Sequence, residues 1–349
     1  MLGSQLHFCK QLPPASRLGR DALLLCDRKL CTSLPQFKKW TNGFPAVYSV
    51  AAGEKLKNID RFPAHIKAIF RQIKHLNPKK LIIVVVGGGS LGDFGGFVAS
   101  ILKRGLPLIH IPTTWLAAID SCHGGKTALN VGKGKNQIGT FYNAKEIFIV
   151  KEILMQEPMN RIQEAGAELA KIALIDGRSW IKPLEKSGPF TTQLLWDLLP
   201  DAIESKMRIV RRDPFEKKGE RAVLNLGHTL GHLLELSVGL PHGQAVAQGL
   251  FFSLDWSLRR GMLSSQEHHR ANNLLKNTLS FLPLNETERF KNKAPRAGRA
   301  REILLQDKKR SSQRELSFVF LKGIGKPVRL SIPTEEILSE MLRQKWIRQ

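Results

Sequence analysis

The stretch LIIVVVGGGSLGDFGGFVAS, residues Leu81–Ser100, decides the fold class. Its opening run LIIVVV is uninterrupted and apolar, which is typical of a strand buried on both faces. Gly87, Gly89 and Gly92 then match the spacing G-x-G-x-x-G, and such glycines let the backbone approach a pyrophosphate at the N-terminus of the next helix. The Rossmann pattern requires an acidic residue at the end of a second strand about 20 residues later, and this chain has none there. The nearest carboxylate to the turn is that of Asp93. An ordinary tight strand-to-helix turn would also use such glycines, so a phosphate-binding turn and a purely structural turn both stay open.

The neighbouring segments repeat this alternation of apolar strands and helices. DALLLCD (Asp21–Asp27) and LPLIHIPTT (Leu106–Thr114) have the short apolar runs of strands. Between them, IDRFPAHIKAIFRQIKHLN (Ile59–Asn77) places apolar residues at helical spacing. Strands separated by helices favour a parallel sheet, so the sequence predicts an α/β domain over residues 1–155.

The pattern changes near residue 155, where helical periodicity replaces the short apolar runs. Helices that end near Gly or Pro are predicted over residues 160–177, 192–212, 222–240 and 245–263. A late segment, ELSFVFLKGIGKPVRLSI, has the two apolar runs of a hairpin. The sequence therefore predicts a mostly helical domain over residues 156–349, with a ligand site in a cleft between the two domains.

The composition is that of a soluble globular chain with an excess of basic residues. The 349 residues carry a formal net charge of +24, with 42% hydrophobic and 24% charged residues. The apolar runs are too short to span a bilayer, and the N-terminus lacks the continuous apolar segment of a secretory signal. Four cysteines without zinc-binding spacing favour reduced thiols in the cytoplasm. The basic clusters 208–221 and 291–314 do not alternate with aromatic residues, so a basic surface or an anionic substrate is favoured over nucleic acid.

A second glycine-rich stretch, residues 112–142, carries candidate groups for binding an anion. It contains Asp120, Lys126, Lys135 and Asn136 among many small residues. Lysines beside glycine turns suit a phosphate or carboxylate ligand, because the turns add backbone N–H donors. A solvated basic loop is the alternative, although an acid so close to these bases favours a site.

Three histidines gather within NLGHTLGHLLELSVGLPHG. His228 and His232 are four residues apart and share a helix face, whereas His242 follows a Gly-Leu-Pro turn. A catalytic divalent metal needs about three protein ligands and an open position. Glu168, with Lys171 three residues later among apolar neighbours, offers a carboxylate, and an exposed ion pair is the alternative. Spacing alone favours the two histidines four residues apart as metal ligands.

The order of the motifs resembles that of one known family. From about Cys26 to Gly325 that order is kept by AAGEKLK, GGGSLGDFGGFVAS, KRGLPLIHIPTT, IDSCHGGKTALN, GKNQIGTFY, AGAELAK, RAVLNLGHTLGH, LPHGQAVAQG and DKK. On these motifs the chain resembles the 3-dehydroquinate synthases of the sugar-phosphate cyclase family. The resemblance implies an N-terminal Rossmann-like, NAD-binding α/β domain followed by a mostly helical metal-binding domain.

The resemblance also implies a role for many of these residues. The metal, expected to be Zn²⁺ with Co²⁺ as a possible substitute, would be held by Glu168, His228 and His242. The other histidine of the helix, His232, would lie near the substrate's phosphate instead. NAD would be contacted by Asp27, Glu54, Lys57, Gly87, Gly88, Gly89, Gly92, Asp93, Thr113, Thr114, Lys126 and Lys135. The catalytic and substrate-binding groups would be Asp120, Lys126, Lys135, Asn136, Lys171, Lys206, Arg221, Asn225, His232 and Lys309 or its neighbour Lys308.

The implied reaction converts 3-deoxy-D-arabino-heptulosonate 7-phosphate to 3-dehydroquinate and phosphate in the shikimate pathway. It comprises a transient NAD-dependent oxidation, phosphate elimination, reduction and an intramolecular aldol closure. A cytoplasmic homodimer is implied, in which Arg104 reaches the neighbouring subunit's site. Two alternatives on the same fold stay open: another sugar-phosphate cyclase, such as one like 2-deoxy-scyllo-inosose synthase, and a metal-dependent polyol dehydrogenase.

Several positions depart from the usual family pattern. Gln244 stands where glutamate is common, so any tuning of the metal by that carboxylate would change. Cys122 and His123 stand where small residues are common, and Lys29 where asparagine is common near NAD. The segment DPFEKKGER is one residue longer than usual, which affects the placement of Lys206. None of these changes removes an expected ligand, so an active enzyme is expected.

Overall fold

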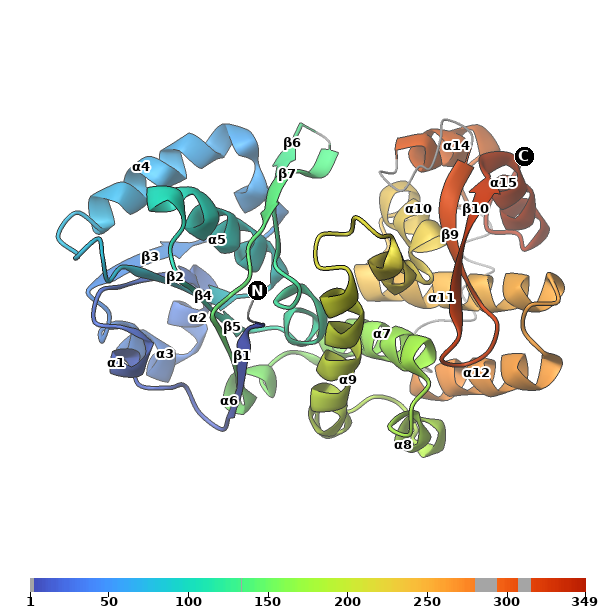
Figure 1. The fold of residues 1–349 in the computed structure, drawn as a ribbon, viewed down its shortest axis with the longest axis horizontal. Coiled ribbons are helices and arrows are strands. Elements are labelled where there is room, and N and C mark those ends of the chain that lie inside the picture. Colours follow the sequence, from blue (N-terminus) through green and yellow to red (C-terminus); the bar gives the residue numbers. More distant parts are fainter. Residues whose placement is uncertain (1–2, 133, 280–293, 307–314) are drawn as a thin grey trace. The chain divides into compact units, whose positions relative to one another are not determined.

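The computed structural model describes residues 3–132, 134–279, 294–306 and 315–349. The chain forms two compact units, Met1–Arg161 and Ile162–Gln349 (Figure 1). The division falls early in helix α7 (Met159–Asp176), a few residues beyond the boundary expected between residues 155 and 156. That functional boundary stays a prediction.

Unit 1 is built on a parallel sheet, as the sequence predicted. The strands stand in the order β1-β8-β5-β4-β2-β3, and every neighbouring pair is parallel. The sheet strands are β1 Gln5–Cys9, β2 Ala22–Asp27, β3 Ala46–Val50, β4 Ile82–Gly87, β5 Leu108–Pro112 and β8 Glu146–Val150. The three predicted strands are β2, β4 and β5. The winding direction reverses between β2 and β4, and ligands of such sheets bind at the carboxyl ends of the strands there.

The two faces of the sheet are covered by different helices, because successive side chains of a strand point to opposite sides. The helical elements of unit 1 are α1 Ala15–Leu18, α2 Arg28–Ser33, α3 Pro35–Thr41, η1 Glu54–Lys57, η2 Ile59–Arg61, α4 Phe62–Gln72, α5 Gly89–Ile101, η3 Leu102–Arg104, η4 Ala117–Ser121 and α6 Lys151–Leu154. Cys26, Val86 and Ile111 face a core shared with α1, α3 and α6, whereas α4 and α5 lie on the opposite side (Figure 1). On that side a Cβ added to Gly95 of α5 would lie 2.5 Å from Val85 Cγ2, so the glycine lets α5 pack closely on β4.

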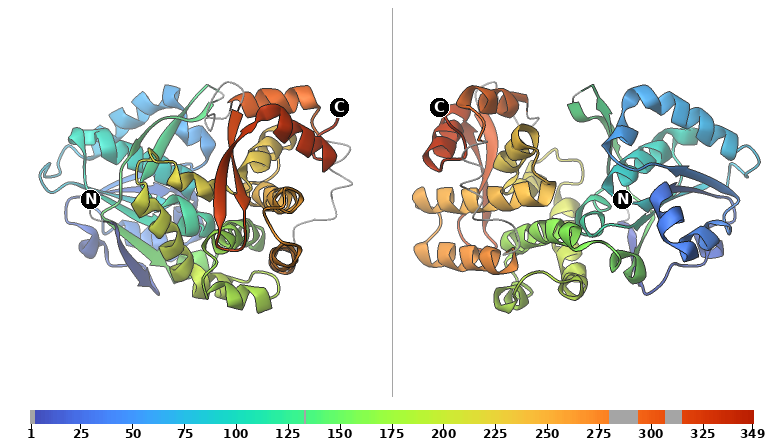
Figure 2. Two further views of the ribbon diagram at one scale, coloured as in Figure 1. Left: turned by 45° about the vertical axis from the view of Figure 1, so that its right-hand side comes forward. Right: turned by 180° about the vertical axis from the view of Figure 1, so that it is seen from behind.

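A separate hairpin follows the π-helical turn η4. Its strands are β6 Lys126–Val131 and β7 Gly134–Phe141. They are antiparallel, with a break in register between Leu129 and Val131. Strand β6 lies beside α5 (Figures 1 and 2), where a Cβ on Gly96 would lie 2.5 Å from Thr127 Cγ2. The hairpin therefore carries its predicted lysines next to the glycine-rich helix.

Unit 2 is mostly helical, which confirms the predicted fold class. Its remaining elements are α8 Ile181–Lys186, α9 Thr192–Arg212, η5 Glu220–Asn225, α10 His228–Val238, α11 His242–Arg259, α12 Ser265–Thr278, α14 Ala297–Gln306, β9 Glu315–Leu321, β10 Pro327–Pro333 and α15 Thr334–Arg343. The late hairpin is present as antiparallel β9 and β10. The helix predicted over 222–240 is wrong in its first part, which forms the 3-10 turn η5. Gly227, at φ +78°, redirects the chain before α10 begins, and a left-handed residue cannot continue a right-handed helix.

The core of unit 2 holds α10 and α11 together. A Cβ on Gly249 would lie 1.8 Å from the Gly227 carbonyl oxygen, so the two helices meet backbone to backbone. Trp256 of α11 packs against Phe318 and Phe320 of β9, with ring centroids 4.7 and 5.0 Å away. Burial of each such side chain contributes roughly 2–3 kcal/mol, so these contacts stabilise the packing of α11 on β9.

Candidate metal and nucleotide sites

The three predicted metal ligands meet in unit 2. Glu168 lies in α7, His228 is the first residue of α10 and His242 is the first residue of α11. One ligand atom from each lies within 4.8 Å of the others. Glu168 Oε1 is 3.2 Å from His242 Nε2 and 3.4 Å from His228 Nε2. Two ligands bonded at about 2.0–2.1 Å to a tetrahedral centre lie about 3.3 Å apart, so this spacing fits a four-coordinate metal.

The start of α11 approaches α7 because residue 243 has no side chain. A Cβ on Gly243 would lie 2.2 Å from Glu164 Cα, far inside van der Waals contact. Glu164 lies one helical turn before Glu168, so this backbone contact brings His242 up to the carboxylate. The glycine after His242 therefore sets the distance between two of the converging side chains.

Both imidazole rings are oriented by acceptors at their far nitrogens. His228 Nδ1 lies 3.2 Å from the Leu226 carbonyl oxygen, and His242 Nδ1 lies 2.8 Å from Glu235 Oε1. When the ring is neutral, as metal binding requires, each acceptor favours the tautomer with its proton on Nδ1, which leaves the Nε2 lone pair for a metal beside Glu168. The sequence pattern did not single out Glu235. The only hint in the sequence was its position two helical turns after His228, which puts both residues on one helix face.

The carboxylate of Glu168 is buried and strongly acidic. Its side chain is 1% exposed and forms an ion pair with Lys171 Nζ, although Oε2 has no well-directed hydrogen bond within the described residues. Burial would raise the pKa of Glu168, but Lys171 and His242 outweigh it and hold the pKa well below its usual range. Burial would lower the pKa of His242, but hydrogen bonds to Glu168 and Glu235 outweigh it and raise the pKa to about 10. A metal at this site would displace the proton on His242.

These donors fit a catalytic zinc site. Two imidazole nitrogens and one carboxylate oxygen form a three-ligand set that leaves one coordination position for a reactant. His232, one turn along α10, lies beside His228 with ring centroids 5.5 Å apart, but it is outside the converging group. The pair of histidines favoured by spacing alone is therefore not the pair that converges within the described residues.

Three further predicted substrate contacts of unit 2 are buried cations. Lys171 lies in α7, Lys206 in α9 and Arg221 in η5, and all three side chains are almost fully buried. Each has a polar partner within the chain, such as Glu168 for Lys171, and the several N–H donors of these side chains also make them candidates for binding an anionic ligand. Asn225 ends η5, a few residues before His228. Lys309 lies outside the described residues.

In unit 1 the predicted NAD contacts gather at the carboxyl ends of β2, β4 and β5. Gly88 is the N-cap residue of α5, and a Cβ there would lie 3.1 Å from Thr114 Cγ2. Asp27 ends β2, and its Oδ1 accepts a hydrogen bond from Lys29 N at 3.1 Å. Backbone N–H groups at the start of α5 would favour an anion, which suits the pyrophosphate interpretation of the turn. The other predicted contacts on this edge are Gly87, Gly89, Gly92, Asp93 and Thr113.

A buried lysine links the end of η1 to α5 and to the hairpin. Lys57 is 2% exposed, and its Nζ donates to Asp93 Oδ2 at 2.6 Å and to Asn136 Oδ1 at 2.5 Å. Glu54 Oε1 is 3.9 Å from the same nitrogen. Burial raises the pKa of Asp93, and the ammonium group of Lys57 opposes the rise. Three predicted contacts therefore meet at the ammonium group of a fourth, Lys57.

The remaining predicted anion contacts lie between β5 and the end of β7. Asp120 lies in η4, Lys126 begins β6, and Lys135 is an exposed residue of β7. His123, which departs from the family pattern, is buried, and its Nε2 lies 2.8 Å from the Ala118 carbonyl oxygen. This histidine therefore helps to hold the η4 turn that carries Asp120.

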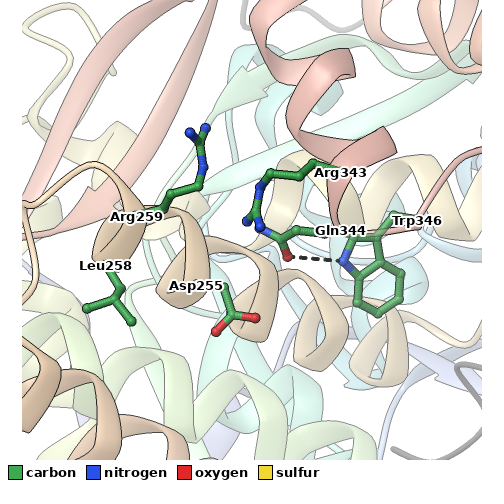
Figure 3. Close-up of a pocket in the computed structure, with 6 residues that line it drawn as sticks. All are labelled: Asp255, Leu258, Arg259, Arg343, Gln344 and Trp346. Atoms are coloured by element: carbon green, nitrogen blue, oxygen red, sulfur yellow. Dashed lines mark hydrogen bonds between the residues drawn. The ribbon is translucent and has the colours of Figure 1, made fainter.

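A pocket of about 600 Å³ in unit 2 contains none of these residues (Figure 3). It is lined by Asp255, Leu258, Arg259, Arg343, Gln344 and Trp346. Arg259 and Arg343 each place Nη2 2.6 Å from the carboxylate of buried Glu340. Asp255 pairs with His268 at 2.7 Å. The charges on the pocket wall thus balance one another within unit 2, which is typical of a structural ion-pair network.

Comparison with known proteins assigns both halves of the chain. A family model described as 3-dehydroquinate synthase N-terminal matches residues 47–164, and one described as 3-dehydroquinate synthase C-terminal matches residues 165–310. A 3-dehydroquinate synthase from Methylacidiphilum infernorum is 34% identical over 334 residues, which cover 94% of this chain and 89% of the relative.

Two solved structures extend the likeness to the fold. One is 2-deoxy-scyllo-inosose synthase complexed with carbaglucose-6-phosphate, NAD⁺ and Co²⁺, with a TM-score of 0.81, 23% identity and coverage of 97% of this chain and 96% of that one. The other is ValA, a 2-epi-5-epi-valiolone synthase from Streptomyces hygroscopicus with NAD⁺ and Zn²⁺ bound, with a TM-score of 0.79, 20% identity and coverage of 99% and 97%. Both family models and the extended match to a curated relative agree: the chain belongs to the 3-dehydroquinate synthase family.

Proposed function

We propose that the chain converts 3-deoxy-D-arabino-heptulosonate 7-phosphate to 3-dehydroquinate and phosphate. The observation that supports this most is the convergence of Glu168, His228 and His242 in a unit that also buries three cations. The substrate carries a carboxylate and a phosphate, and both are groups that buried lysine and arginine bind. The names of the curated relatives support the same activity.

The proposed cofactors are NAD⁺ and a divalent metal, with Zn²⁺ preferred and Co²⁺ as a substitute. Glu168, His228 and His242 would hold the metal, and the carboxyl edge of the sheet in unit 1 would hold NAD⁺. When bound, the metal would acidify a substrate hydroxyl while NAD⁺ accepts and later returns a hydride. The similar solved cyclases contain NAD⁺ with Co²⁺ or Zn²⁺, which supports this pair.

The chain's own charged side chains would position the substrate. Arg221 would hold the carboxylate, since a guanidinium can donate two parallel N–H bonds to it. Lys126, Asn136 and His232 would bind the phosphate and stabilise the charge that develops on its oxygens as it leaves. The further proposed contacts are Asp120, Lys135, Lys171, Lys206, Asn225 and Lys309.

Phosphate release from the sugar phosphate tests the proposal. With a catalytic amount of NAD⁺, we expect phosphate and 3-dehydroquinate in equal amounts, no net NADH, and loss of turnover with a chelator that added Zn²⁺ or Co²⁺ reverses. Accumulation of NADH in step with product would indicate a polyol dehydrogenase instead. Turnover of glucose 6-phosphate in place of the heptulosonate would indicate the alternative cyclase.

A cytoplasmic homodimer, with Arg104 reaching the neighbouring subunit's site, is part of the proposal. Arg104 lies in η3 with φ +69°, a left-handed conformation that is uncommon outside glycine and often found at functional sites. Within the described ranges, each helix is too short or too polar to cross a bilayer. Chains carrying Arg104→Ala and chains carrying Glu168→Ala should each be inactive alone. Expressed together, they should regain activity if the arginine acts across subunits, and should stay inactive if it acts within one.

A further inference from the structure

A closed ring of polar contacts joins η1 to the hairpin of unit 1. Lys57 Nζ lies 3.9 Å from Glu54 Oε1 and donates to Asn136 Oδ1 at 2.5 Å. Asn136 N donates to Asn130 Oδ1 at 2.8 Å, and Asn130 Nδ2 donates to Glu54 Oε2 at 2.8 Å. Three members of this ring are proposed ligand contacts, whereas the fourth, Asn130, has no role in the proposed function.

Asn130 stands where the register of the hairpin breaks. The pairing of β6 with β7 shifts between Leu129 and Val131, and the backbone of Asn130 instead bridges to Asn58, the residue after η1. Such irregularities redirect a side chain and are over-represented beside active sites. Here the break brings the amide of Asn130 between η1 and β7.

A side-chain amide suits both neighbours of Asn130 at once. Its oxygen has to face the N–H donor of Asn136, and its nitrogen has to face the carboxylate of Glu54, so the two partners fix the orientation of the amide. An aspartate would keep the first contact but would place a second carboxylate against Glu54, where like charges repel. The ring is therefore sensitive to the exchange of one nitrogen atom for oxygen.

Asn136 depends on this support because its backbone is left-handed, with φ +53°. Asparagine tolerates that conformation better than most residues, but it persists only where the surroundings impose it. The bond from its N–H to Asn130 and the bond from Lys57 to its Oδ1 hold the residue from two sides. With Oδ1 held, the amide presents Nδ2 as its donor end.

We propose that Asn130 is a positioning residue that fixes the phosphate contact Asn136 relative to the NAD⁺ contact Glu54. It touches neither ligand in this role and acts through its two hydrogen bonds. The identities of the two ligands rest on the proposed function, whereas the ring of contacts does not.

Substitutions that reverse the donor and the acceptor test this role in the intact chain. Asn130→Asp should raise both the KM for the sugar phosphate and the Kd for NAD⁺ about tenfold, because displaced contacts lose alignment with their ligands. Its thermal midpoint should stay within about 2 °C of the wild type. Adding Glu54→Gln places an amide opposite the new carboxylate, so the double variant should return both constants to within about threefold of Glu54→Gln alone. Asn77→Asp, the same exchange in an exposed turn before β4, is the matched control and should change neither constant.

The results separate the positioning role from the alternatives. A double variant as impaired as Asn130→Asp, or wild-type constants in Asn130→Asp, would overturn it. A lowered thermal midpoint with unchanged KM and Kd would also overturn it, since that is the effect of a purely structural residue. A wild-type chain that binds NAD⁺ but releases no phosphate would refute the proposed function alone, because the NAD⁺ affinities of the variants still report on the ring.

Discussion

Two histidines, one in each unit, have pKa values shifted in opposite directions. His110 in β5 is 8% exposed, and burial alone lowers its pKa to about 4. The side chain of His242 is 32% exposed, and burial acts on it in the same direction, but Glu168 and Glu235 raise its pKa to about 10. Burial therefore keeps a histidine neutral within the sheet, whereas two carboxylates make it a cation at the head of α11. A site that holds a proton so firmly has the charge to hold a metal in its place.

A second contrast separates the two polar clusters of the molecule. In unit 2 the triad of Glu168, His228 and His242 depends on a buried carboxylate, and helices that meet backbone to backbone fix its distances. In unit 1 the ring around Lys57 lies on a turn and a hairpin, and hydrogen bonds between side chains fix it. We therefore expect charge and backbone changes to break the triad, and donor–acceptor changes to break the ring.

Removal of the central carboxylate should have the largest effect. Glu168→Ala deletes a metal ligand and leaves the buried Lys171 without its partner, so we expect loss of bound metal and at least about a thousandfold loss of phosphate release. If the alanine variant folds poorly, Glu168→Gln takes its place as the test. It keeps the side-chain volume and should also lose the metal. Metal content of the purified chain and phosphate release measure both effects.

The matched control for this change is Glu204→Ala, which removes an exposed carboxylate paired with Arg211 on α9. It should keep both metal and activity, because exposed ion pairs contribute little. NAD⁺ affinity should survive Glu168→Ala, since the proposed nucleotide contacts lie in unit 1. Full activity in a metal-free Glu168→Ala chain would refute the ligand assignment.

A methyl group at residue 243 should have the next largest effect. Gly243→Ala places a Cβ 2.2 Å from Glu164 Cα, so α11 has to move away from α7 and carry His242 from Glu168. Displacement of a ligand by about 1 Å commonly costs about a hundredfold, and we expect that loss in metal affinity and activity. Gly188→Ala, where no atom lies within 4 Å of the added Cβ, should leave both unchanged. Equal metal affinities in the two variants would show that the helix contact does not set the ligand distance.

The fold could be predicted from the sequence wherever local periodicity encodes it. The apolar runs of β2, β4 and β5 and the long helices of unit 2 were predicted, because a strand or helix repeats its burial pattern within a few residues. The helix predicted over 222–240 was wrong at its start. There Gly227 takes a left-handed conformation against Gly249, and a contact between two helices leaves no periodic pattern in either one.

The site could be predicted only in part. Spacing favoured His228 and His232, whereas the side chains that converge on Glu168 are those of His228 and His242, the pair implied by the order of the family's motifs. The supporting residues Glu235 and Asn130 were missed, because a single polar residue on a helix or strand resembles a solvated one until its partner is known. The sequence suggested that a carboxylate near the metal is missing at Gln244. In the structure, the carboxylate that contacts His242 Nδ1 is that of Glu235, two turns after the start of α10.

Loss of the acceptor at the far nitrogen of His242 should have a moderate effect. Glu235→Ala leaves Nδ1 without its carboxylate, and loss of such a partner typically lowers metal affinity by roughly thirtyfold. Because the three ligands remain, excess Zn²⁺ should restore the rate of phosphate release. Glu185→Ala, which removes a carboxylate paired with Arg270 at the surface of unit 2, should leave the metal affinity unchanged. A loss of activity in Glu235→Ala that excess metal does not reverse would contradict an orienting role.

The smallest expected effect is a pH dependence of stability that comes from unit 1. The pKa of His110 is about 4 in the folded chain and about 6.5 in an unfolded one, so burial in the neutral form costs nothing above about pH 6.5. As the pH falls from 6.5 toward 4, the unfolded chain takes up a proton that the folded chain excludes, and stability is lost over that window. Between about pH 7 and 5.5 the free energy of unfolding should fall by about 1 kcal/mol from this residue. Over this pH range, the free energy of unfolding of His110→Gln, measured with urea, should fall by about 1 kcal/mol less than that of the wild type. The same slope in wild type and His110→Gln would mean that His110 reaches water or an acidic partner, and the contrast with His242 would then not rest on carboxylates alone.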